Sequence, residues 1–127
     1  MPRSVVFSPN APKPVSAYSQ AISTGSLLFL AGQIPLDPVT GQVVSGTVAE
    51  ETERVIANIK AVLAAAGAGL EHIVKTTVYL TDMADFAAFN AAYSSHFVQD
   101  PPARTTVAVT ALPLGVRVEV EAIAALP

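Results

Sequence analysis

Apolar positions recur along the chain with two periods, and the longer period predicts a helix from Val48 to about Ala66. Apolar side chains appear there every three or four residues, which places them on one side of a helix. Thr47 and Glu50 have the spacing of a capping box, in which each side chain bonds a backbone N–H that the first turn leaves unpaired. Gly67 supplies the left-handed residue that ends many helices. The sequence therefore predicts both the ends and the buried side of this helix.

A second helix is predicted to begin at Asp82, because an aspartate side chain can cap a first turn. Asp85 adds negative charge near the positive end of the helix dipole. Four aromatic residues follow at helical spacing: Phe86, Phe89, Tyr93 and Phe97. Such a row is far more typical of a hydrophobic core than of a cofactor site, so we expect it to pack inside the protein.

Six segments have the composition or the alternation that is typical of β-strands. They are Ser4–Phe7, Tyr18–Ile22, Ser26–Ala31, Ile73–Leu80, Thr105–Val109 and Val116–Ile123. Gly25 lies between the second and third segments, which favours a hairpin. In the fourth segment, alternation predicts that Val74 and Val78 lie on the apolar side and Tyr79 on the other.

These elements follow one another in the order β-β-β-α-β-α-β-β, which is an α+β arrangement. With 127 residues the chain has the length of one domain, so we predict a single domain over residues 1–127. Because crossover connections are right-handed, two helices separated by one strand fall on the same face of a sheet. The sequence therefore predicts a mixed sheet with two helices packed on one face and an open second face rich in Val and Leu.

The composition indicates that part of the protein surface is covered by another copy of the chain. Hydrophobic residues make up 51% of the sequence and charged residues only 13%, against about 25% charged residues in ordinary soluble domains. A compact monomer would therefore expose much uncharged surface. The formal net charge of -3 argues against nucleic acid as a partner, because binding to a phosphate backbone depends on Lys and Arg.

Several kinds of site are disfavoured by what the sequence lacks. It has no cysteine, which removes disulfides, thiolate nucleophiles and iron–sulfur clusters. His72 and His96 are far apart and have no partner ligand at helical spacing, so no metal site is expected. The longest nearly continuous apolar stretch, Val62–Leu70, is about half the length of a membrane helix. The N-terminus lacks the apolar core of a signal peptide, so we expect a cytoplasmic protein without a membrane partner.

The sequence contains no common catalytic motif, but four polar residues occupy unusual positions: Tyr18, Asn90, Arg104 and Glu119. Each of them, taken alone, has an ordinary structural explanation as a surface residue or a hydrogen-bonded side chain. Glu121 shares one side of the last predicted strand with Glu119, and we expect it to lie near Arg117.

Six segments, taken together and in order, are similar to the motifs of one protein family. They are Ala17–Ala21 (AYSQA), Ala31–Pro38 (AGQIPLDP), Asn58–Lys60 (NIK), Val74–Leu80 (VKTTVYL), Pro102–Arg104 (PAR) and Val118–Ala124 (VEVEAIA). By these segments the chain resembles the RidA (YjgF, reactive intermediate deaminase) family over nearly its whole length. The resemblance implies a chorismate-mutase-like α+β fold and a homotrimer with three clefts between subunits. It also implies hydrolysis of 2-imino acids and their enamine tautomers, such as 2-iminobutanoate and 2-iminopropanoate, to 2-oxo acids and ammonia, without a cofactor or metal.

The same resemblance assigns roles to individual residues. Arg104 and Glu119 are implied as the catalytic residues. A guanidinium group can grip the carboxylate of the substrate through two parallel N–H bonds, and a carboxylate can move a proton from water to the departing amine. Tyr18, Gly32 and Thr106 are implied, together with Arg104, as substrate-binding residues.

Two departures from the family pattern leave the substrate open. The chain has Ser16 and Ala17 where the family usually has Gly-Pro, and its loop over residues 98–103 is shorter. A small-metabolite-binding protein with the same fold and no deaminase activity is therefore an alternative. An endoribonuclease is a second alternative, which the acidic composition disfavours. Asn90 is expected to support the site rather than to act as a catalyst.

Overall fold

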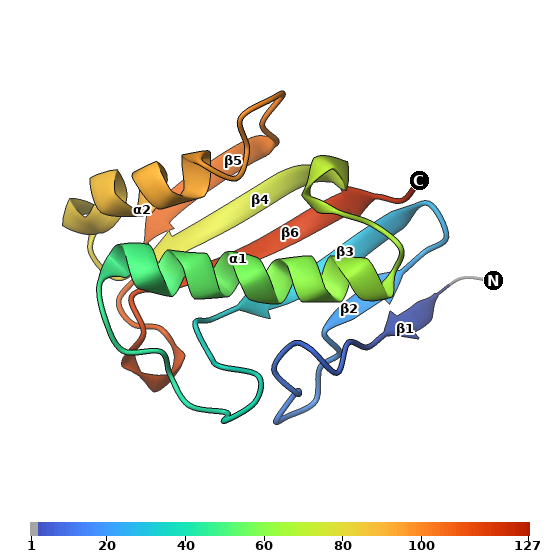
Figure 1. The fold of residues 1–127 in the computed structure, drawn as a ribbon, viewed down its shortest axis with the longest axis horizontal. Coiled ribbons are helices and arrows are strands. Elements are labelled where there is room, and N and C mark those ends of the chain that lie inside the picture. Colours follow the sequence, from blue (N-terminus) through green and yellow to red (C-terminus); the bar gives the residue numbers. More distant parts are fainter. Residues whose placement is uncertain (1–2) are drawn as a thin grey trace.

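The computed structural model describes residues 3–127 as one six-stranded sheet with two α-helices (Figure 1). The strands are β1 (Ser4–Val6), β2 (Ala21–Ser23), β3 (Leu27–Gln33), β4 (Ile73–Leu80), β5 (Ala103–Ala108) and β6 (Val118–Ala125), and the helices are α1 (Val48–Ala65) and α2 (Phe86–Ser94). Short 3-10 turns cover Leu70–His72, Met83–Asp85 and Pro113–Gly115. Met1 and Pro2, which begin the N-terminal segment considered above, lie outside the described residues.

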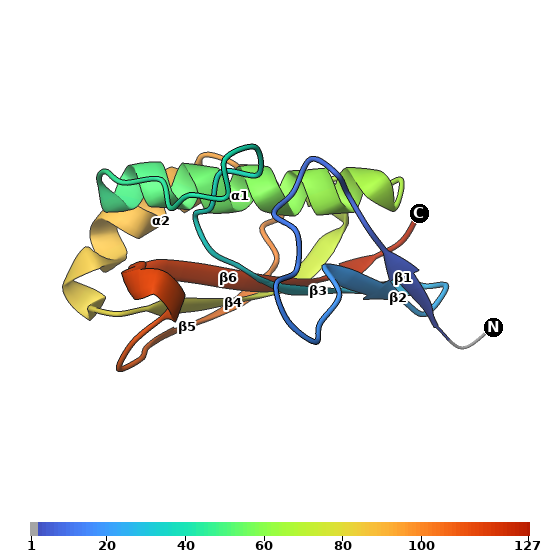
Figure 2. The ribbon, with the colours of Figure 1, turned by 90° about the horizontal axis from the view of Figure 1, so that it is seen from below.

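The sheet is mixed, with the strand order β1-β2-β3-β6-β4-β5. β4 and β5 run parallel and are joined through α2, whereas the other neighbouring pairs are antiparallel. Both helices lie on one face of the sheet, and the other face has no helix on it (Figure 2). The predicted element order and the predicted side of the helices are therefore confirmed. Within residues 3–127, no helix is both long enough and apolar enough to cross a membrane.

The hydrophobic core fills the layer between the helices and the sheet. Side chains of α1 pack there against β3, β4 and β6, and the buried set includes Val55, Ile56, Ile59, Val62, Leu63, Leu28, Val78, Val118 and Val120. Phe89 and Tyr93 of α2 are buried in the same cluster, and Phe86 and Phe97 pack against it. The helical stripe and the aromatic row are core residues, as the sequence predicts.

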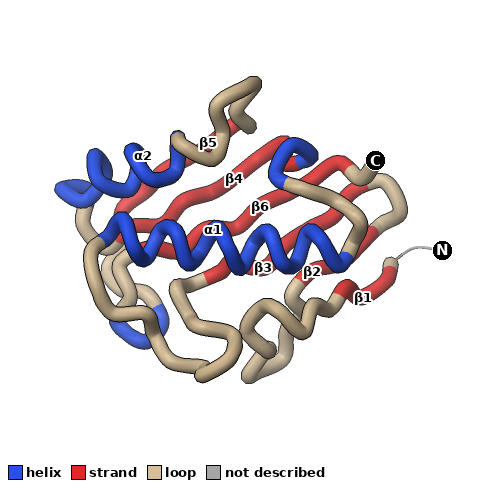
Figure 3. Tube along the Cα trace, in the orientation of Figure 1, coloured by secondary structure: helices blue, strands red, loops and turns tan. Residues whose placement is uncertain are grey.

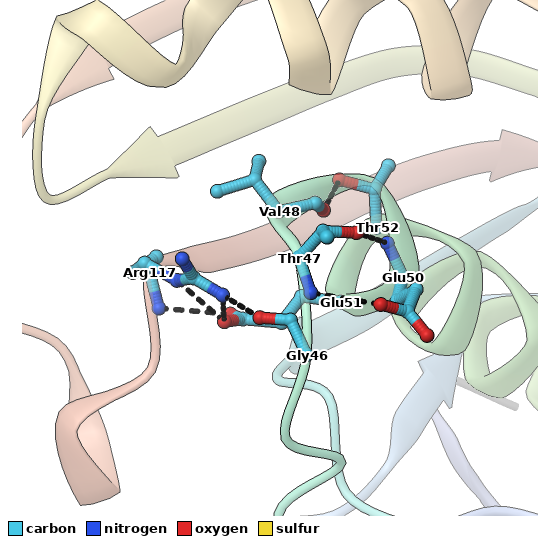
Figure 4. Close-up of polar contacts among 7 residues, drawn as sticks. All are labelled: Gly46, Thr47, Val48, Glu50, Glu51, Thr52 and Arg117. Atoms are coloured by element: carbon cyan, nitrogen blue, oxygen red, sulfur yellow. Dashed lines mark hydrogen bonds and ion pairs between the residues drawn. The ribbon is translucent and has the colours of Figure 1, made fainter.

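Two sets of side-chain contacts fix the first turn of α1 (Figure 4). The hydroxyl of Thr47 accepts a hydrogen bond from the backbone N–H of Glu50 at 3.1 Å, and Oε1 of Glu50 accepts one from the backbone N–H of Thr47 at 2.9 Å, which confirms the capping box. The buried Glu51 accepts bonds from the backbone N–H and the Nε of Arg117 at 2.9 and 2.7 Å. Arg117 also donates to the carbonyl of Gly46. These contacts tie the start of α1 to the residue that precedes β6.

The second helix begins later than the sequence predicts. Asp82 does cap a turn, since its carboxylate accepts a hydrogen bond from the backbone N–H of Ala84 at 2.9 Å, but that turn is the 3-10 turn over Met83–Asp85. The α-helix itself starts at Phe86. A 3-10 turn is a frequent start of an α-helix, and here it delays the first α-helical residue.

β4 departs from the predicted alternation near its start. Its pairing with β6 contains one extra residue between Ile73 and Lys75, so Val74 is exposed and the prediction that it shares the buried side with Val78 is wrong. Thr76 occupies the buried position instead. Its hydroxyl lies 2.8 Å from the hydroxyl of Tyr93, which satisfies both polar groups inside the core.

The open face of the sheet is more polar than the sequence predicts. Leu27 and Phe29 of β3 and Val107 of β5 are partly exposed there. Between them the central strands place a polar set: Lys75, Thr77 and Tyr79 on β4, and Glu119 and Glu121 on β6. The expectation of a face rich in Val and Leu is wrong at these strands, because their alternation directs the valines to the helix side.

Candidate active site

Glu119 lies on the open face of β6, next to β3. The pairing of these two strands is irregular between Leu30 and Gln33, where β3 has one residue more than β6. Gly32 lies in this irregular stretch, and a Cβ atom at that position would overlap the Oε2 atom of Glu119. The glycine therefore provides the space in which the carboxylate lies against β3.

The loop that carries Tyr18 is held by the buried side chain of Gln20. The amide oxygen of Gln20 accepts a hydrogen bond from the backbone N–H of Ser8 at 2.6 Å, and its amide nitrogen donates to the carbonyls of Ser8 and Pro12 at 3.0 Å each. A proline-rich segment cannot satisfy its backbone groups by strand pairing, so this side chain replaces the missing partners. Sequence reasoning missed Gln20, although a polar residue directly before an apolar strand and after several prolines was a usable signal.

Tyr18, Gly32 and Glu119 line one cavity of about 530 Å³. Its walls come from the loop before β2 and the loop after β3, which run along the same edge of the molecule (Figure 3), and from the turn before β6. Most wall residues are apolar: Pro12, Val15, Ala31, Ile34, Leu36, Pro113 and Leu114. Among the described lining residues, Glu119 is the one acid and Lys13 the one base. The cavity thus presents a carboxylate in largely apolar surroundings.

The environment of Glu119 makes its carboxyl group easier to protonate. Burial raises the pKa of Glu119 above its ordinary value, and the negative charge of Glu121 raises it further. Glu121 accepts a hydrogen bond from the hydroxyl of Tyr79, and this bond, together with burial, raises the pKa of Tyr79 to about 12. A carboxyl group with a raised pKa is a stronger base, once ionised, than an ordinary carboxylate.

The expectation that Glu121 lies near Arg117 is wrong. Arg117 binds Glu51 of α1, on the helix side of the molecule. Glu121 binds Tyr79 of the neighbouring strand on the open face. Glu51 and Tyr79 come from distant parts of the chain. The short sequence separation between Arg117 and Glu121 therefore does not make them a pair.

Arg104 lies on the helix side of β5, beside α2. β5 starts two residues earlier than predicted, so Arg104 belongs to the strand and pairs with Thr76. Its Nη1 donates a hydrogen bond to Oδ1 of Asn90 at 2.8 Å, and its Cζ is 4.9 Å from the centre of the Tyr93 ring. No carboxylate of residues 3–127 forms an ion pair with it. An amide oxygen and aromatic faces therefore hold this cation without neutralising its charge.

A second cavity, of about 340 Å³, adjoins Arg104. Its lining residues are Asn90, Tyr93, Ser94, Phe97, Pro101, Pro102 and Arg104. Thr106 pairs with the buried Val78 of β4, so it lies on the helix side of β5, as Arg104 does. Its hydroxyl is buried and has no hydrogen-bond partner within the described part of the chain. The structure therefore brings Tyr18, Gly32 and Glu119 together, but places Arg104 and Thr106 on the other face of the sheet.

Both histidines form hydrogen bonds with groups other than Glu119 and Arg104. Nδ1 of His72 accepts a hydrogen bond from the backbone N–H of Gly69 at 2.9 Å. Nε2 of His96 lies 2.7 Å from Oε1 of Glu53. Over residues 3–127, no three His, Asp or Glu side chains are grouped as metal ligands would be.

The fold and the cavity on its open face define the class of protein. The family model described as "Endoribonuclease L-PSP" matches residues 8–126. A RutC family protein of Pyrococcus abyssi is 53% identical over 124 residues, which cover 98% of each chain. A mouse protein named 2-iminobutanoate/2-iminopropanoate deaminase is 43% identical over 96% of this chain and 90% of its own length. The crystal structure of the YjgF gene product of Escherichia coli superposes with a TM-score of 0.93 at 38% identity, over 98% of this chain and 99% of that one.

These likenesses extend over almost the whole chain and agree with the residues that carried the resemblance in sequence. The chain belongs to the RidA family, which the L-PSP model and the YjgF structure both represent. The predicted family and the predicted α+β fold, with two helices on one face of a mixed sheet, are confirmed.

Proposed function

We propose that the protein is a hydrolytic deaminase that converts 2-imino acids and their enamine tautomers, such as 2-iminobutanoate and 2-iminopropanoate, to 2-oxo acids and ammonia. The observation that carries this proposal is the half-buried Glu119, whose carboxylate lines an apolar cavity and has a raised pKa. The deaminase name of the mouse relative supports the same reaction.

The reaction needs one group that accepts and returns a proton. In the first step the oxygen of water bonds to the carbon of the protonated imine, the C=N π electrons move to the nitrogen, and the carboxylate of Glu119 accepts a proton from that water. In the second step Glu119 returns the proton to the amine nitrogen, and the C–N bond breaks. The lone pair of the new hydroxyl forms the C=O bond as ammonia leaves, and the hydroxyl proton passes to Glu119 and then to solvent. Tyr18 supplies a hydroxyl on the wall of the same cavity.

The substrate also carries a carboxylate, which calls for a cation with fixed geometry. Arg104 suits this task because its guanidinium has N–H groups in a planar fork and no ion-pair partner in residues 3–127. Arg104 and Glu119 lie on opposite faces of one sheet, so one chain does not form the complete site by itself. We infer that Arg104 and Thr106 of one copy meet the Glu119 cavity of another copy.

A homotrimer is the assembly that we propose for this purpose. A closed ring of three copies gives three equivalent contacts, each pairing an Arg104 edge with a Glu119 cavity. The helix-free face of the sheet, the exposed Leu27 and Phe29, and the low fraction of charged residues support burial of this surface against other copies. Sedimentation equilibrium at micromolar concentration is expected to give the mass of three chains, and a stable monomer would refute the shared site.

The deaminase function is tested by generating the imine in situ. A pyridoxal-phosphate threonine dehydratase releases 2-iminobutanoate from threonine, and formation of 2-oxobutanoate is followed with wild-type protein, with the Glu119→Gln variant and with neither. Wild-type protein is expected to accelerate the formation of 2-oxobutanoate well beyond the rate of spontaneous hydrolysis. The Glu119→Gln variant is expected not to accelerate it. Binding of 2-oxobutanoate by calorimetry without any acceleration would instead identify a metabolite-binding protein, and cleavage of RNA without imine hydrolysis would identify an endoribonuclease.

A further inference from the structure

Glu119 and Glu121 on β6 and Tyr79 on β4 form a polar row on the open face of the sheet. In the strand register Tyr79 pairs with Glu119, and Thr77 pairs with Glu121. The hydroxyl of Tyr79 nevertheless donates its hydrogen bond to Oε1 of Glu121. The two carboxylates therefore differ, because Glu121 has a fixed donor and Glu119 receives no hydrogen bond from residues 3–127.

We propose that Tyr79 is a positioning residue that holds the Glu121 carboxylate beside Glu119, so that the charge of Glu121 favours protonation of Glu119 during the reaction. Tyr79 and Glu121 are not among the residues that line the Glu119 cavity. They therefore act through Glu119 and not by contact with the substrate. This proposal rests on the deaminase function proposed above and adds the control of its proton carrier.

Local electrostatics supports this division of roles. Residues two apart on one side of a strand are roughly 6.5 to 7 Å apart, near enough for one anion to disfavour ionisation of the other carboxyl group. The hydrogen bond from Tyr79 fixes the place of the Glu121 carboxylate on the open face. Burial and the charge of Glu121 then raise the pKa of Glu119, as described above.

The other charged groups near the pair do not cancel this effect. Lys75 lies on the open face of β4, and Lys13 lines the cavity in front of Glu119. Within residues 3–127, neither lysine forms an ion pair with Glu119 or Glu121. β3, on the other side of β6, contributes the uncharged Gly32. Within this chain, Glu121 is the charged group that raises the pKa of Glu119. Arg104 of another copy, which the shared site proposed above brings to this cavity, has the opposite effect, and it is the same in the wild type and in the variants compared below.

The arrangement has a consequence for the reaction. Without the bond from Tyr79, the Glu121 side chain would be free to turn away from Glu119, and its effect on the protonation of Glu119 would weaken with distance. Held in place by this bond, Glu121 favours transfer of the water proton to Glu119, which lines the cavity.

Carbon-13 NMR of the Glu side-chain carboxyl carbons tests the proposal without reference to catalysis. In the wild type, Glu119 is expected to titrate in a single step. In Glu121→Gln its midpoint is expected to fall to lower pH, because the neighbouring negative charge is gone. In Tyr79→Phe the Glu119 midpoint is expected to fall part of the way towards its value in Glu121→Gln, because Glu121 is no longer held beside Glu119. Glu53→Gln, which removes an exposed carboxylate on α1, is the control and should leave Glu119 unchanged.

Glu121→Asp keeps the charge and is expected to keep the Glu119 midpoint closer to the wild-type value than Glu121→Gln does. This variant also covers the case in which the neutral variant fails to fold. An unchanged Glu119 midpoint in a folded Glu121→Gln protein or in a folded Tyr79→Phe protein would overturn the proposal.

The pH profile of kcat/KM provides the second measurement. Its acid limb reports ionisation of the group that accepts the water proton. In Glu121→Gln this limb is expected to move to lower pH, in step with the NMR midpoint, and in Glu53→Gln it should not move. If the wild type shows no imine hydrolysis, the proposed function fails while the NMR titration still decides the role of Tyr79. If hydrolysis is present and the limb does not move in Glu121→Gln, the proposed control fails and the deaminase function stands.

Discussion

The Glu119 cavity and the Arg104 cavity differ in the surroundings that they give to the charged side chain assigned to the proposed reaction. Glu119 lies at an apolar wall on the open face, where burial raises its pKa and favours the protonated form. Arg104 lies on the helix side, where the Tyr93 ring and the Asn90 oxygen surround the guanidinium. Burial thus changes the ionisation of the acid, while aromatic and amide contacts hold the cation.

This difference matches the two tasks of the proposed reaction. A proton carrier must change its charge state during each cycle, and a clamp for a carboxylate must not change. Within one chain the two groups lie on opposite faces of one sheet, so they come together only in the site that we propose between two copies. The predictions below therefore change one task at a time.

The largest expected effect is that of Glu119→Gln. The amide keeps the shape of the side chain but accepts no proton, so kcat/KM is expected to fall by about 10²-fold or more. The thermal midpoint should remain equal to the wild-type value or rise, because the variant removes a half-buried charge beside Glu121. Kinetics at matched oligomeric state and thermal denaturation are the measurements, with Glu53→Gln as the control. Near-normal kcat/KM would show that Glu119 is not the proton carrier.

Replacement of Arg104 by Lys is expected to be almost as damaging as replacement by Ala, with a loss in kcat/KM of about 10- to 100-fold. Lys keeps the charge but lacks the planar fork, and its shorter reach towards Asn90 loses the contact that orients Arg104. Steady-state kinetics on both variants is the measurement, with the trimer confirmed by sedimentation. A Lys variant that retains most of the activity would mean that charge alone is sufficient.

A mixture of two inactive variants tests whether the two tasks are shared between copies. Glu119→Gln and Arg104→Ala proteins are unfolded together, refolded at equal concentration and assayed. In a ring of three, random assembly restores one intact site in each mixed trimer, so activity is expected to return to about a quarter of the wild-type value. The same proteins refolded separately are the control. Activity that stays at the level of the separate variants would place both groups of each site in one chain.

The sequence was sufficient for elements that are determined locally. α1 follows from its apolar stripe, from the Thr47–Glu50 capping box and from Gly67, whose φ of 73° is the left-handed conformation expected at a helix end. The family motifs likewise identified Gly32 and Glu119, which the structure brings into contact across two strands. The residues that define α1 are close in sequence, and Gly32 and Glu119 each belong to a family motif.

Contacts between distant strands could not be predicted from the same pattern. The partner of Arg117 is Glu51, 66 residues away in the chain, and only the pairing of β4 with β6 brings Tyr79 to Glu121. The extra residue at Val74 shifts the register by one, which alternation within a single strand does not reveal. The separation of Arg104 from Glu119 depends on both registers, so it becomes visible in the structure alone.

The smallest expected effect is that of Asn90→Asp, which changes the clamp without touching the proton carrier. The amide oxygen of Asn90 accepts a bond from Nη1 of Arg104 and orients the guanidinium while leaving its charge free. An aspartate there would accept the same bond but add a negative charge that competes with the carboxylate of the substrate. KM is expected to rise by about three- to tenfold, kcat to change little, and the thermal midpoint to stay equal or rise. Ala87→Asp adds the same charge at an exposed position of α2 and should leave KM unchanged. An equal rise in KM in both variants would attribute the effect to net charge, and a loss confined to kcat would mean that Asn90 supports the reacting groups and not the carboxylate clamp.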